Sequence, residues 1–286
     1  MQSFEYKFIE AITKDYLSSI TPARKLLFQL RFDPKFHPQN VKEGLRNKQI
    51  YSMVKEQLSK GSSLPTGTDL KFLIRTLADA FETQMLQDGV DIEFLKSDEP
   101  GKDGKWQVVY DWLWQKYFPR WLLEQQWQEL VAKADKVDDW LQVTPGERTL
   151  RMPEPRQSTI PLKTEVYLLV NLNWVNRFFL LLYQGTDGKK YCLCPSKGFA
   201  PSSELSEQKM YLPQRDAEEL SMYFQDTGKE HFLGIVMEKP LDLQWLRPNA
   251  QEPVPSLDAN RFNELWNNLE QQGNLQLFYK SFDVVG

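Results

Sequence analysis

Residues 164–194 read TEVYLLVNLNWVNRFFLLLYQGTDGKKYCLC, and this stretch decides the fold of the C-terminal half. Its runs Thr164–Asn171, Val175–Tyr183 and Lys189–Cys194 are rich in β-branched, aromatic and aliphatic residues, which is typical of strands. The sequence GTDG at 185–188, between the second and third runs, predicts a hairpin turn. A β-rich domain is therefore expected here.

The same pattern continues beyond this stretch. Further strands are predicted over Glu207–Leu212, Glu219–Phe224, Glu230–Met237 and Leu275–Val285. Asn260–Gln272 has its apolar residues on one helical face, and Gly273 follows its end. Short strands at close spacing with turn signals are typical of an antiparallel sandwich or a barrel-like fold, here with one C-terminal helix.

Residues 1–143 have a helical period instead. One helical face is formed by apolar residues four apart: Phe4, Phe8, Ile12 and Tyr16. Thr21 followed by Pro22 predicts the N-cap and first position of a second helix, with Leu26, Leu27 and Leu30 buried. Later helices are predicted over Lys48–Leu58, from Thr68 to Met85, and across residues 106–131 with an interruption at Pro119.

The proline-rich segment 144–161 lies between these two patterns and is interpreted as a linker. We therefore predict an α+β protein with a helical domain over 1–143 and a β-rich domain over 162–286. The change of period across this segment is the evidence for two domains.

The composition indicates a globular protein. Of the 286 residues, 41% are hydrophobic and 26% are charged, which is not a disordered composition. Cys192 and Cys194 are the only cysteines, so no disulfide framework is expected and a cytoplasmic location is predicted. The sequence has no run of about 18 apolar residues and no signal-peptide core, so no membrane partner is expected.

The stretch from Pro161 to about Leu246 resembles the bacterial family called domain of unknown function 4384. The resemblance is carried by EVYLLV at 165–170, FFLLLY at 178–183, Asp187-Gly188, Cys194-Pro195-Ser196, Leu212-Pro213, and DTGKE at 226–230 before FLGIV at 232–236. Members of that family often stand at the end of bacterial signalling chains, so the resemblance implies a regulatory or sensing module. It implies no catalytic residues.

Residues 21–32, TPARKLLFQLRF, resemble the opening helix of the helix-turn-helix region of sigma-like regulators, and NKQI at 47–50 would open the next helix. This resemblance implies DNA binding. The candidate phosphate contacts are the basic residues of that region: Arg46, Lys48, Lys55, Lys71 and Arg75. The alternative is a solvated helix face, because Glu43, Glu56 and Asp69 are interspersed.

Few residues could carry catalysis. The only histidines are His37 and His231. A cysteine nucleophile needs a histidine base within hydrogen-bond reach, which His231 could supply to Cys192 or Cys194 across a sheet. The alternative is that both thiols are buried core groups. No glycine-rich nucleotide motif and no metal-ligand spacing occurs, so neither a cofactor nor a metal is expected.

The tryptophan-rich stretch Trp106–Trp127 could form a binding platform, but its helical spacing favours the core. We therefore expect a non-enzymatic regulatory or sensing protein that acts through protein or ligand binding by its β-rich module. Two alternatives stay open. One is a DNA-binding regulator that uses the helical domain, and the other is a hydrolase with a site near His231.

Overall fold

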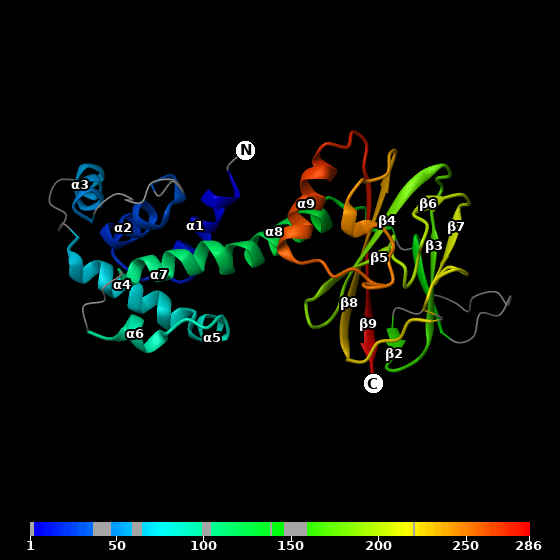
Figure 1. Ribbon diagram of the computed structural model, residues 1–286, viewed down its shortest axis with the longest axis horizontal. Helices are drawn as coiled ribbons and strands as arrows, with labels where there is room; N and C mark the ends of the chain where they lie inside the picture. The colour runs from blue at the N-terminus through cyan, green and yellow to red at the C-terminus, as the bar shows by residue number, and fades with distance from the viewer. Residues whose placement is uncertain are drawn as a thin grey trace. The chain divides into compact units, whose positions relative to one another are not determined.

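The computed structural model describes residues 3–36, 47–58, 65–98, 104–137, 139–145, 159–219 and 221–286. The chain divides into two compact units, Met1–Leu122 and Leu123–Gly286. Helices form the first unit, and two sheets with helices form the second (Figure 1). The predicted α+β class is confirmed.

The first unit is built from helices that follow the predicted periodicity. They are α1 Phe4–Asp15, α2 Pro22–Phe32, α3 Asn47–Gln57, α4 Gly67–Ala80, α5 Glu82–Gln87, α6 Ile92–Lys96 and α7 Lys105–Trp112, and α8 Phe118–Lys133 begins here. A 3-10 turn, Pro34–Phe36, follows α2. The predicted cap of α2 is confirmed, because the Thr21 hydroxyl accepts a hydrogen bond from the backbone N–H of Arg24 at 3.4 Å.

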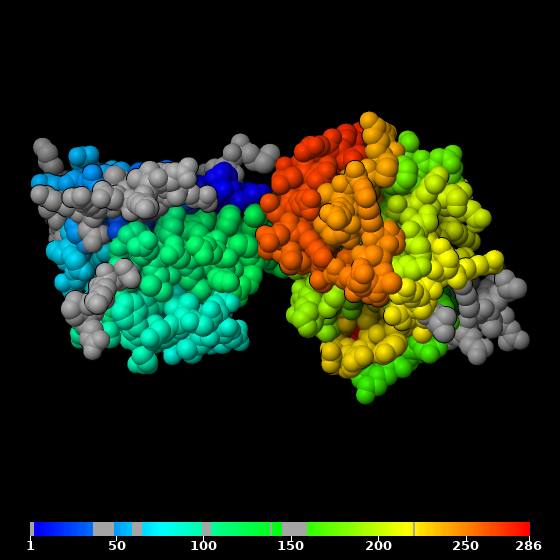
Figure 2. Space-filling view, viewed as in Figure 1, coloured from blue at the N-terminus to red at the C-terminus, as the bar shows by residue number. Residues whose placement is uncertain are grey.

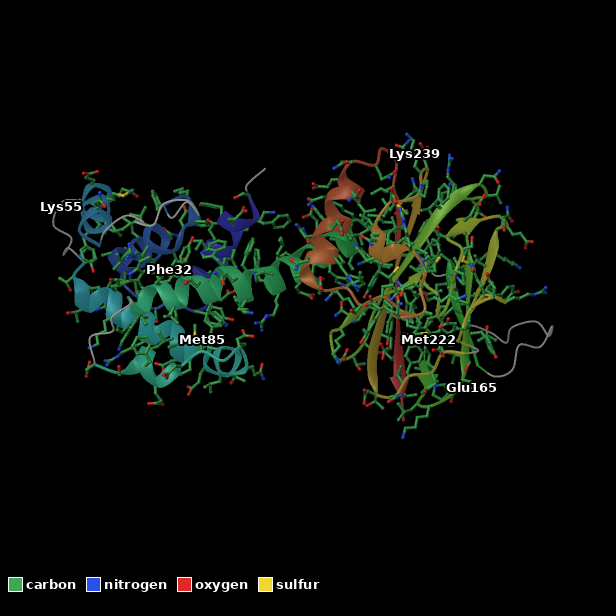
Figure 3. The ribbon with its side chains drawn as sticks, in the orientation of Figure 1. Phe32, Lys55, Met85, Glu165, Met222 and Lys239 are labelled. Atoms are coloured by element: carbon green, nitrogen blue, oxygen red, sulfur yellow. The ribbon has the colours of Figure 1, made fainter. Side chains whose placement is uncertain are left out.

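An aromatic core holds these helices together. The Phe8 ring is fully buried and meets the rings of Trp114 at 5.2 Å and Phe118 at 5.1 Å between centroids. Phe32 and Met85 also point into this interior (Figure 3). Tilted and edge-on ring pairs of this kind stabilise a core beyond the area they bury.

Two predicted helix boundaries in this unit are wrong. The helix expected from Thr68 to Met85 breaks at Phe81, whose ψ of 18° is not helical, and the ring there packs 4.3 Å from that of Tyr16. The chain also stays helical through Pro119, because a π-helical turn over Leu113–Tyr117 precedes it. In that turn the Phe118 N–H bonds to Leu113 O, five residues back, so a wider turn accommodates the proline.

The second unit contains two sheets. The three-stranded sheet has the order β1 Leu141–Pro145, β3 Val166–Asn171 and β7 Lys209–Leu212. The six-stranded sheet has the order β2 Thr159–Pro161, β9 Gln276–Val285, β8 Gly228–Met237, β4 Arg177–Gln184 and β5 Lys190–Cys194, and β6 Glu204–Leu205 also pairs with β4. β2 and β9 are parallel, and the other pairs are antiparallel.

The core of this unit lies between the two sheets. Residues of β3, β4, β8 and β9, most of them alternating along each strand, form one buried cluster: Val166, Leu168, Val170, Phe179, Leu181, Phe232, Val236, Phe278 and Phe282. Such alternation places one face of each sheet inward. The arrangement is therefore a sandwich, and the described strands do not close into a barrel.

The other face of the six-stranded sheet is also buried. Its residues Leu180, Leu182, Leu233 and Ile235 have no exposed surface. Helix α9, Ala259–Glu270, supplies Phe262, Leu265, Trp266 and Leu269 as its buried residues, and the Trp127 ring of α8 lies 6.3 Å from that of Phe262. Helix α9 forms part of the visible surface of this unit (Figure 2).

Three further predictions differ from the structure. The division between the units falls inside α8, at Leu122/Leu123, and not near residue 143. The ends of the predicted linker are strands, since β1 reaches Pro145 and β2 begins at Thr159, while 146–158 lie outside the described residues. Of the predicted strand 219–224, the described residues 219 and 221–224 form no strand, and Met222 forms an isolated bridge with Val166.

Candidate functional site

Two of the basic residues predicted to contact DNA are held by one carboxylate. Lys71 and Arg75, one turn apart on α4, both form ion pairs with Asp98, and Arg75 Nη2 lies 2.9 Å from its Oδ1. Arg75 also donates to the carbonyl of Lys96 at 2.7 Å. The hydrogen bond from Lys71 and the nearby guanidinium lower the pKa of Asp98. The positive charge of this pair is therefore partly neutralised locally.

Of the other three basic residues, the structure describes the side chain of Lys55 alone. Lys55 is exposed on α3, at the periphery of the helical unit (Figure 3). Lys48 lies in α3, and its side chain is outside the described part. Arg46 falls wholly outside the described residues. The connection between α3 and α4 runs from residue 58 to residue 66, which is longer than the three or four residues of a helix-turn-helix turn.

His231 lies on the helix-covered face of the six-stranded sheet. Its Nδ1 is 2.5 Å from the hydroxyl of Tyr279, and its register partners are Gln184 on β4 and Ser281 on β9. Burial, followed by the charge of Lys229, lowers the pKa of His231. Within the described ranges, Tyr279 is the group that its ring nitrogen contacts, and no thiol lies within hydrogen-bond distance.

Both cysteines are completely buried on β5. Cys192 Sγ donates to the carbonyls of Cys194 at 3.3 Å and Pro195 at 3.4 Å. Burial raises the pKa of each thiol, which leaves little of the thiolate that acts as a nucleophile or metal ligand. Among the described residues, no group of three His, Cys, Asp or Glu side chains is placed to hold a metal ion.

The tryptophan-rich stretch is part of the core. Trp112 and Trp127 are 3% and 1% exposed. The Trp112 indole donates to Asp88 Oδ2 at 2.8 Å, and the Trp114 indole donates to the carbonyl of Phe32 at 2.9 Å. Because Trp112 and Trp127 are buried and the N–H groups of Trp112 and Trp114 bind internal acceptors, these rings do not form an open platform for bases.

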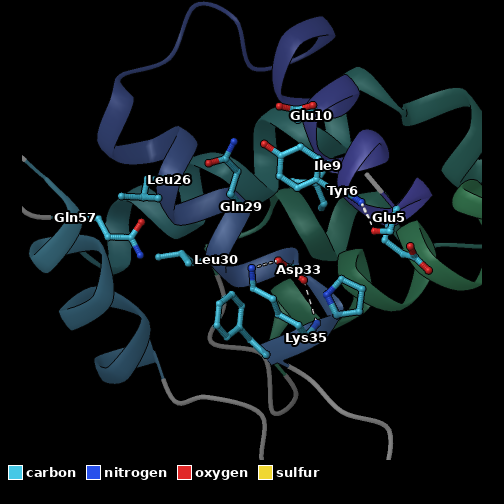
Figure 4. A pocket seen from close by; sticks show the side chains of 13 residues that line it. Glu5, Tyr6, Ile9, Glu10, Leu26, Gln29, Leu30, Asp33, Lys35 and Gln57 are labelled. Atoms are coloured by element: carbon cyan, nitrogen blue, oxygen red, sulfur yellow. Dashed lines mark hydrogen bonds and ion pairs between the residues drawn. The ribbon is translucent and has the colours of Figure 1, made fainter. Parts of the chain in front are cut away.

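A large hollow lies in the helical unit, between α1 and α2 (Figure 4). Its volume is about 590 Å³, within the range of roughly 300–1,000 Å³ usual for ligand clefts. Helix α1 contributes Glu5, Tyr6, Ile9 and Glu10, and α2 with its C-cap contributes Leu26, Gln29, Leu30 and Asp33. We call this hollow the α1–α2 groove.

The spacing of these residues explains the groove. The α2 positions are three, four and seven apart, which places them on one helix face, and the α1 positions share a face in the same way. Ile9 and Leu30 are 6% and 7% exposed and form the floor, whereas Tyr6 is 48% exposed at the mouth. Phe36, at the end of the 3-10 turn after α2, also lines the groove.

The rim of the α1–α2 groove is acidic. It carries the carboxylates of Glu5, Glu10 and Asp33, and Lys35 is the cation among the lining residues. Lys35 is already paired with Asp33, at 2.8 Å from its Oδ2. Glu5 and Glu10 form no ion pair within the part of the chain that the structure describes, and a hydrogen bond to Glu10 raises the pKa of Tyr6.

Sequence reasoning missed this groove. The four-residue spacing of Phe4, Phe8 and Ile12 identified the core face of α1, and Tyr6 and Ile9 lie beside it. A second apolar pair, flanked by Glu5 and Glu10, was the available signal. Leu26 was expected in the core, but it is only partly buried and lines the groove.

The β-rich unit offers smaller hollows. One of about 370 Å³ lies beside β6 and β7 and includes Lys209 and Arg215. Another of about 420 Å³ lies between the ends of α8 and α9 and the start of β9. The first is lined by as many basic as acidic side chains, and the second by Lys133 as well as Asp135 and Glu270, so neither is as acidic as the α1–α2 groove.

Comparison with known proteins yields no assignment. No protein-family model matches this chain, and no curated protein matches it significantly. The two family resemblances therefore stay predictions. Among the helices that the structure describes, none combines the length and the apolar character that crossing a bilayer requires.

Proposed function

We propose that this protein is a non-catalytic regulatory or sensing protein that works by binding another protein at the α1–α2 groove. The observation that carries this proposal is the groove itself, with a floor of Ile9 and Leu30 and an exposed wall on α1. Apolar hollows rimmed by polar groups on a surface mark interaction sites. The proposal places binding in the helical unit, whereas the sequence pointed to the β-rich one.

A protein partner suits the groove better than a small molecule. Small-molecule sites enclose most of the surface of their ligand. Here Glu5, Tyr6 and Glu10 are exposed, so the hollow is open along its α1 side. A partner that buries only one of its faces fits such a site.

DNA binding by the helical unit stays a prediction without further support. Lys71 and Arg75 share Asp98, and the α1–α2 groove of that unit carries acidic residues. Carboxylates repel the phosphate backbone, which supplies most of the affinity of DNA-binding proteins.

The test is site-directed photo-crosslinking in the native host. A photoreactive amino acid replaces Gln29 in the groove, and in a control protein it replaces exposed Tyr223. We expect an adduct from position 29 alone. The captured protein, once purified, should bind the wild-type chain and lose at least tenfold in affinity with Leu26→Asp.

Leu86→Asp is the matched control, because Leu86 is 56% exposed on α5, outside the groove. It should leave the affinity unchanged. Thermal melting must show that both variants are folded. Equal adducts from both crosslinking positions, or an affinity that Leu26→Asp does not alter, would overturn the proposed function.

A further inference from the structure

The geometry points to a specific kind of partner, a basic amphipathic helix of another protein that lies in the α1–α2 groove. This inference rests on the proposed function and adds the conformation and the charge of the bound segment. Three features of the groove carry it: its helical walls, its apolar floor and its acidic rim.

The walls of the groove determine the conformation of the segment. Both long walls are α-helices, α1 and α2, and most of their backbone N–H and C=O groups bond within each helix. They offer no backbone ladder to an extended peptide, unlike the edge of a sheet. A segment that leaves water here must satisfy its own backbone groups, and a helix does so.

The floor determines where the apolar side chains of the segment lie. Leu26 and Leu30 are one turn apart on α2, and Ile9 faces the same hollow from α1. Their side chains form rows between which the side chains of a third helix can pack. A bound helix would therefore present apolar residues at positions i, i+3 or i+4, and i+7, the usual anchors of a helix in a groove.

The acidic rim of the groove determines the charge that the bound helix should carry. Glu5 and Glu10 stand on α1 at the mouth, and the lining cation, Lys35, is bound to Asp33 at 2.8 Å. The groove therefore presents two carboxylates that have no cationic partner in the described residues. Lysine or arginine on the flank of the bound helix would complement them. Such complementarity contributes to specificity and to the rate of association more than to affinity.

The probe is a displayed library of random 16-residue peptides, selected on the full-length chain and counter-selected on Leu26→Asp. We expect enriched sequences with apolar residues at helical spacing and an excess of lysine and arginine. A synthetic copy of the best sequence should become helical when bound, as circular dichroism can show. Its affinity should fall as salt rises from 50 to 500 mM.

Reversing the charges of the acidic rim tests its role directly. Glu5→Lys combined with Glu10→Lys should lower the affinity for the basic peptide by roughly three- to twentyfold, because exposed ion pairs contribute modestly to binding. A peptide with glutamate at the basic positions should recover part of that loss. Tyr6→Glu is a second groove variant in case Leu26→Asp fails to fold, and Glu93→Lys on α6 is the control for reversing an exposed carboxylate outside the groove.

The outcomes separate this inference from the proposed function. If the library yields no enriched sequences, or yields acidic or extended ones, the inference fails, while a crosslinked partner sensitive to Leu26→Asp keeps the function. A concentration-dependent dimer, seen by sedimentation and lost in Leu26→Asp, would assign the groove to a second copy and overturn the inference. If the crosslinked partner binds all groove variants as tightly as it binds the wild-type chain, both the proposed function and this inference fail.

Discussion

Glu230 is a carboxylic acid inside the sandwich. It is 3% exposed, and its Oε2 accepts a hydrogen bond from the Tyr183 hydroxyl at 2.7 Å. Burial raises the pKa of Glu230 above its ordinary value of 4.5, and the hydrogen bond from Tyr183 opposes that rise. Burial also raises the pKa of Tyr183, so the phenol remains a donor.

A raised carboxyl pKa makes folding depend on pH. The folded chain holds the proton of Glu230 more tightly than the unfolded chain does. The stabilisation is therefore complete below pH 4.5 and is lost as the pH rises through the folded-state pKa. We expect Glu230→Gln, which keeps an acceptor for Tyr183, to increase the free energy of unfolding at pH 8.

Urea denaturation at pH 8 and pH 4.5 measures this effect. The advantage of Glu230→Gln should shrink at the lower pH, where the acid is increasingly protonated in both states. Glu219→Gln is the control, because Glu219 is exposed. A destabilised Glu230→Gln at pH 8 would show that the carboxylate is better compensated than its contacts indicate.

The contribution of His231 to stability depends on pH in the opposite direction to that of Glu230. Burial and the charges of Lys229 and Lys190 lower its pKa below 6.5, while Glu124 and Asp283 oppose the change. The folded chain therefore binds this proton less tightly than the unfolded chain. The stability contributed by neutral His231 is present above pH 6.5 and is lost as the pH falls through the folded-state pKa.

The corresponding variant is His231→Gln, which retains a polar contact for Tyr279. Wild-type protein should lose more stability than this variant between pH 8 and pH 5.5, as urea denaturation can measure. His37→Gln serves as the control, since it removes the other histidine of the chain. Parallel losses in wild type and His231→Gln would contradict the assigned environment.

At the scale of elements, one glycine fixes how closely Trp140 packs on the six-stranded sheet. A Cβ atom at Gly234 on β8 would lie 2.8 Å from Cζ3 of Trp140 and 3.1 Å from Cε2 of Phe179. Trp140 is 2% exposed and Phe179 is fully buried, so neither ring can move into solvent without losing core contacts.

Gly234→Ala should therefore destabilise the protein by about 1–3 kcal/mol, the usual cost of overpacking. The matched control is Gly273→Ala after α9, where an added Cβ meets nothing within 4 Å. Thermal melting followed by tryptophan fluorescence measures both. Equal melting temperatures for the two variants would mean that the Trp140 ring can shift at little cost.

Local signals predicted those elements whose cause is local. Thr21 and Pro22 specify the start of α2, and GTDG at 185–188 specifies its turn, with Gly188 at φ +78°. The break at Phe81 could not be predicted, because it depends on ring contacts with Tyr16 and Tyr117, which are distant in sequence. The α1–α2 groove likewise requires knowing which helices are neighbours.

At the scale of the molecule, the sequence predicts the boundary between the two units near residue 143, and the structure places it at Leu122/Leu123, inside α8. The sequence of α8 gives no sign of this division, because the helix has no internal break. Helix α8 runs from Phe118 to Lys133, and the division falls within it. Trp121 belongs to the aromatic core of the first unit, whereas Trp127 packs on Phe262 of the second. Continuous apolar spacing along one helix cannot show that its two ends serve different cores.

A cleavage experiment tests this division. A specific protease site is placed between Pro145 and Thr159, within the segment first interpreted as a linker. Because β1 pairs with β3 along Leu141–Pro145, the cut should leave residues 1–145 and 159–286 associated on size-exclusion chromatography. Separation of the two pieces without denaturant would restore the boundary near residue 143.

The pairing of β9 has a consequence for how the β-rich unit folds. β9 lies between β2 and β8 in the six-stranded sheet, and its pairing with β2 joins Thr159 to Asp283. On the ribosome, that sheet must wait for β9, the last of its strands to be made, while the helical unit is already complete. Pairing across such long separations is slow. During that interval the edge of β8 that pairs with β9 has unpaired N–H and C=O groups, so the unfinished sheet offers a template to which another strand can bind.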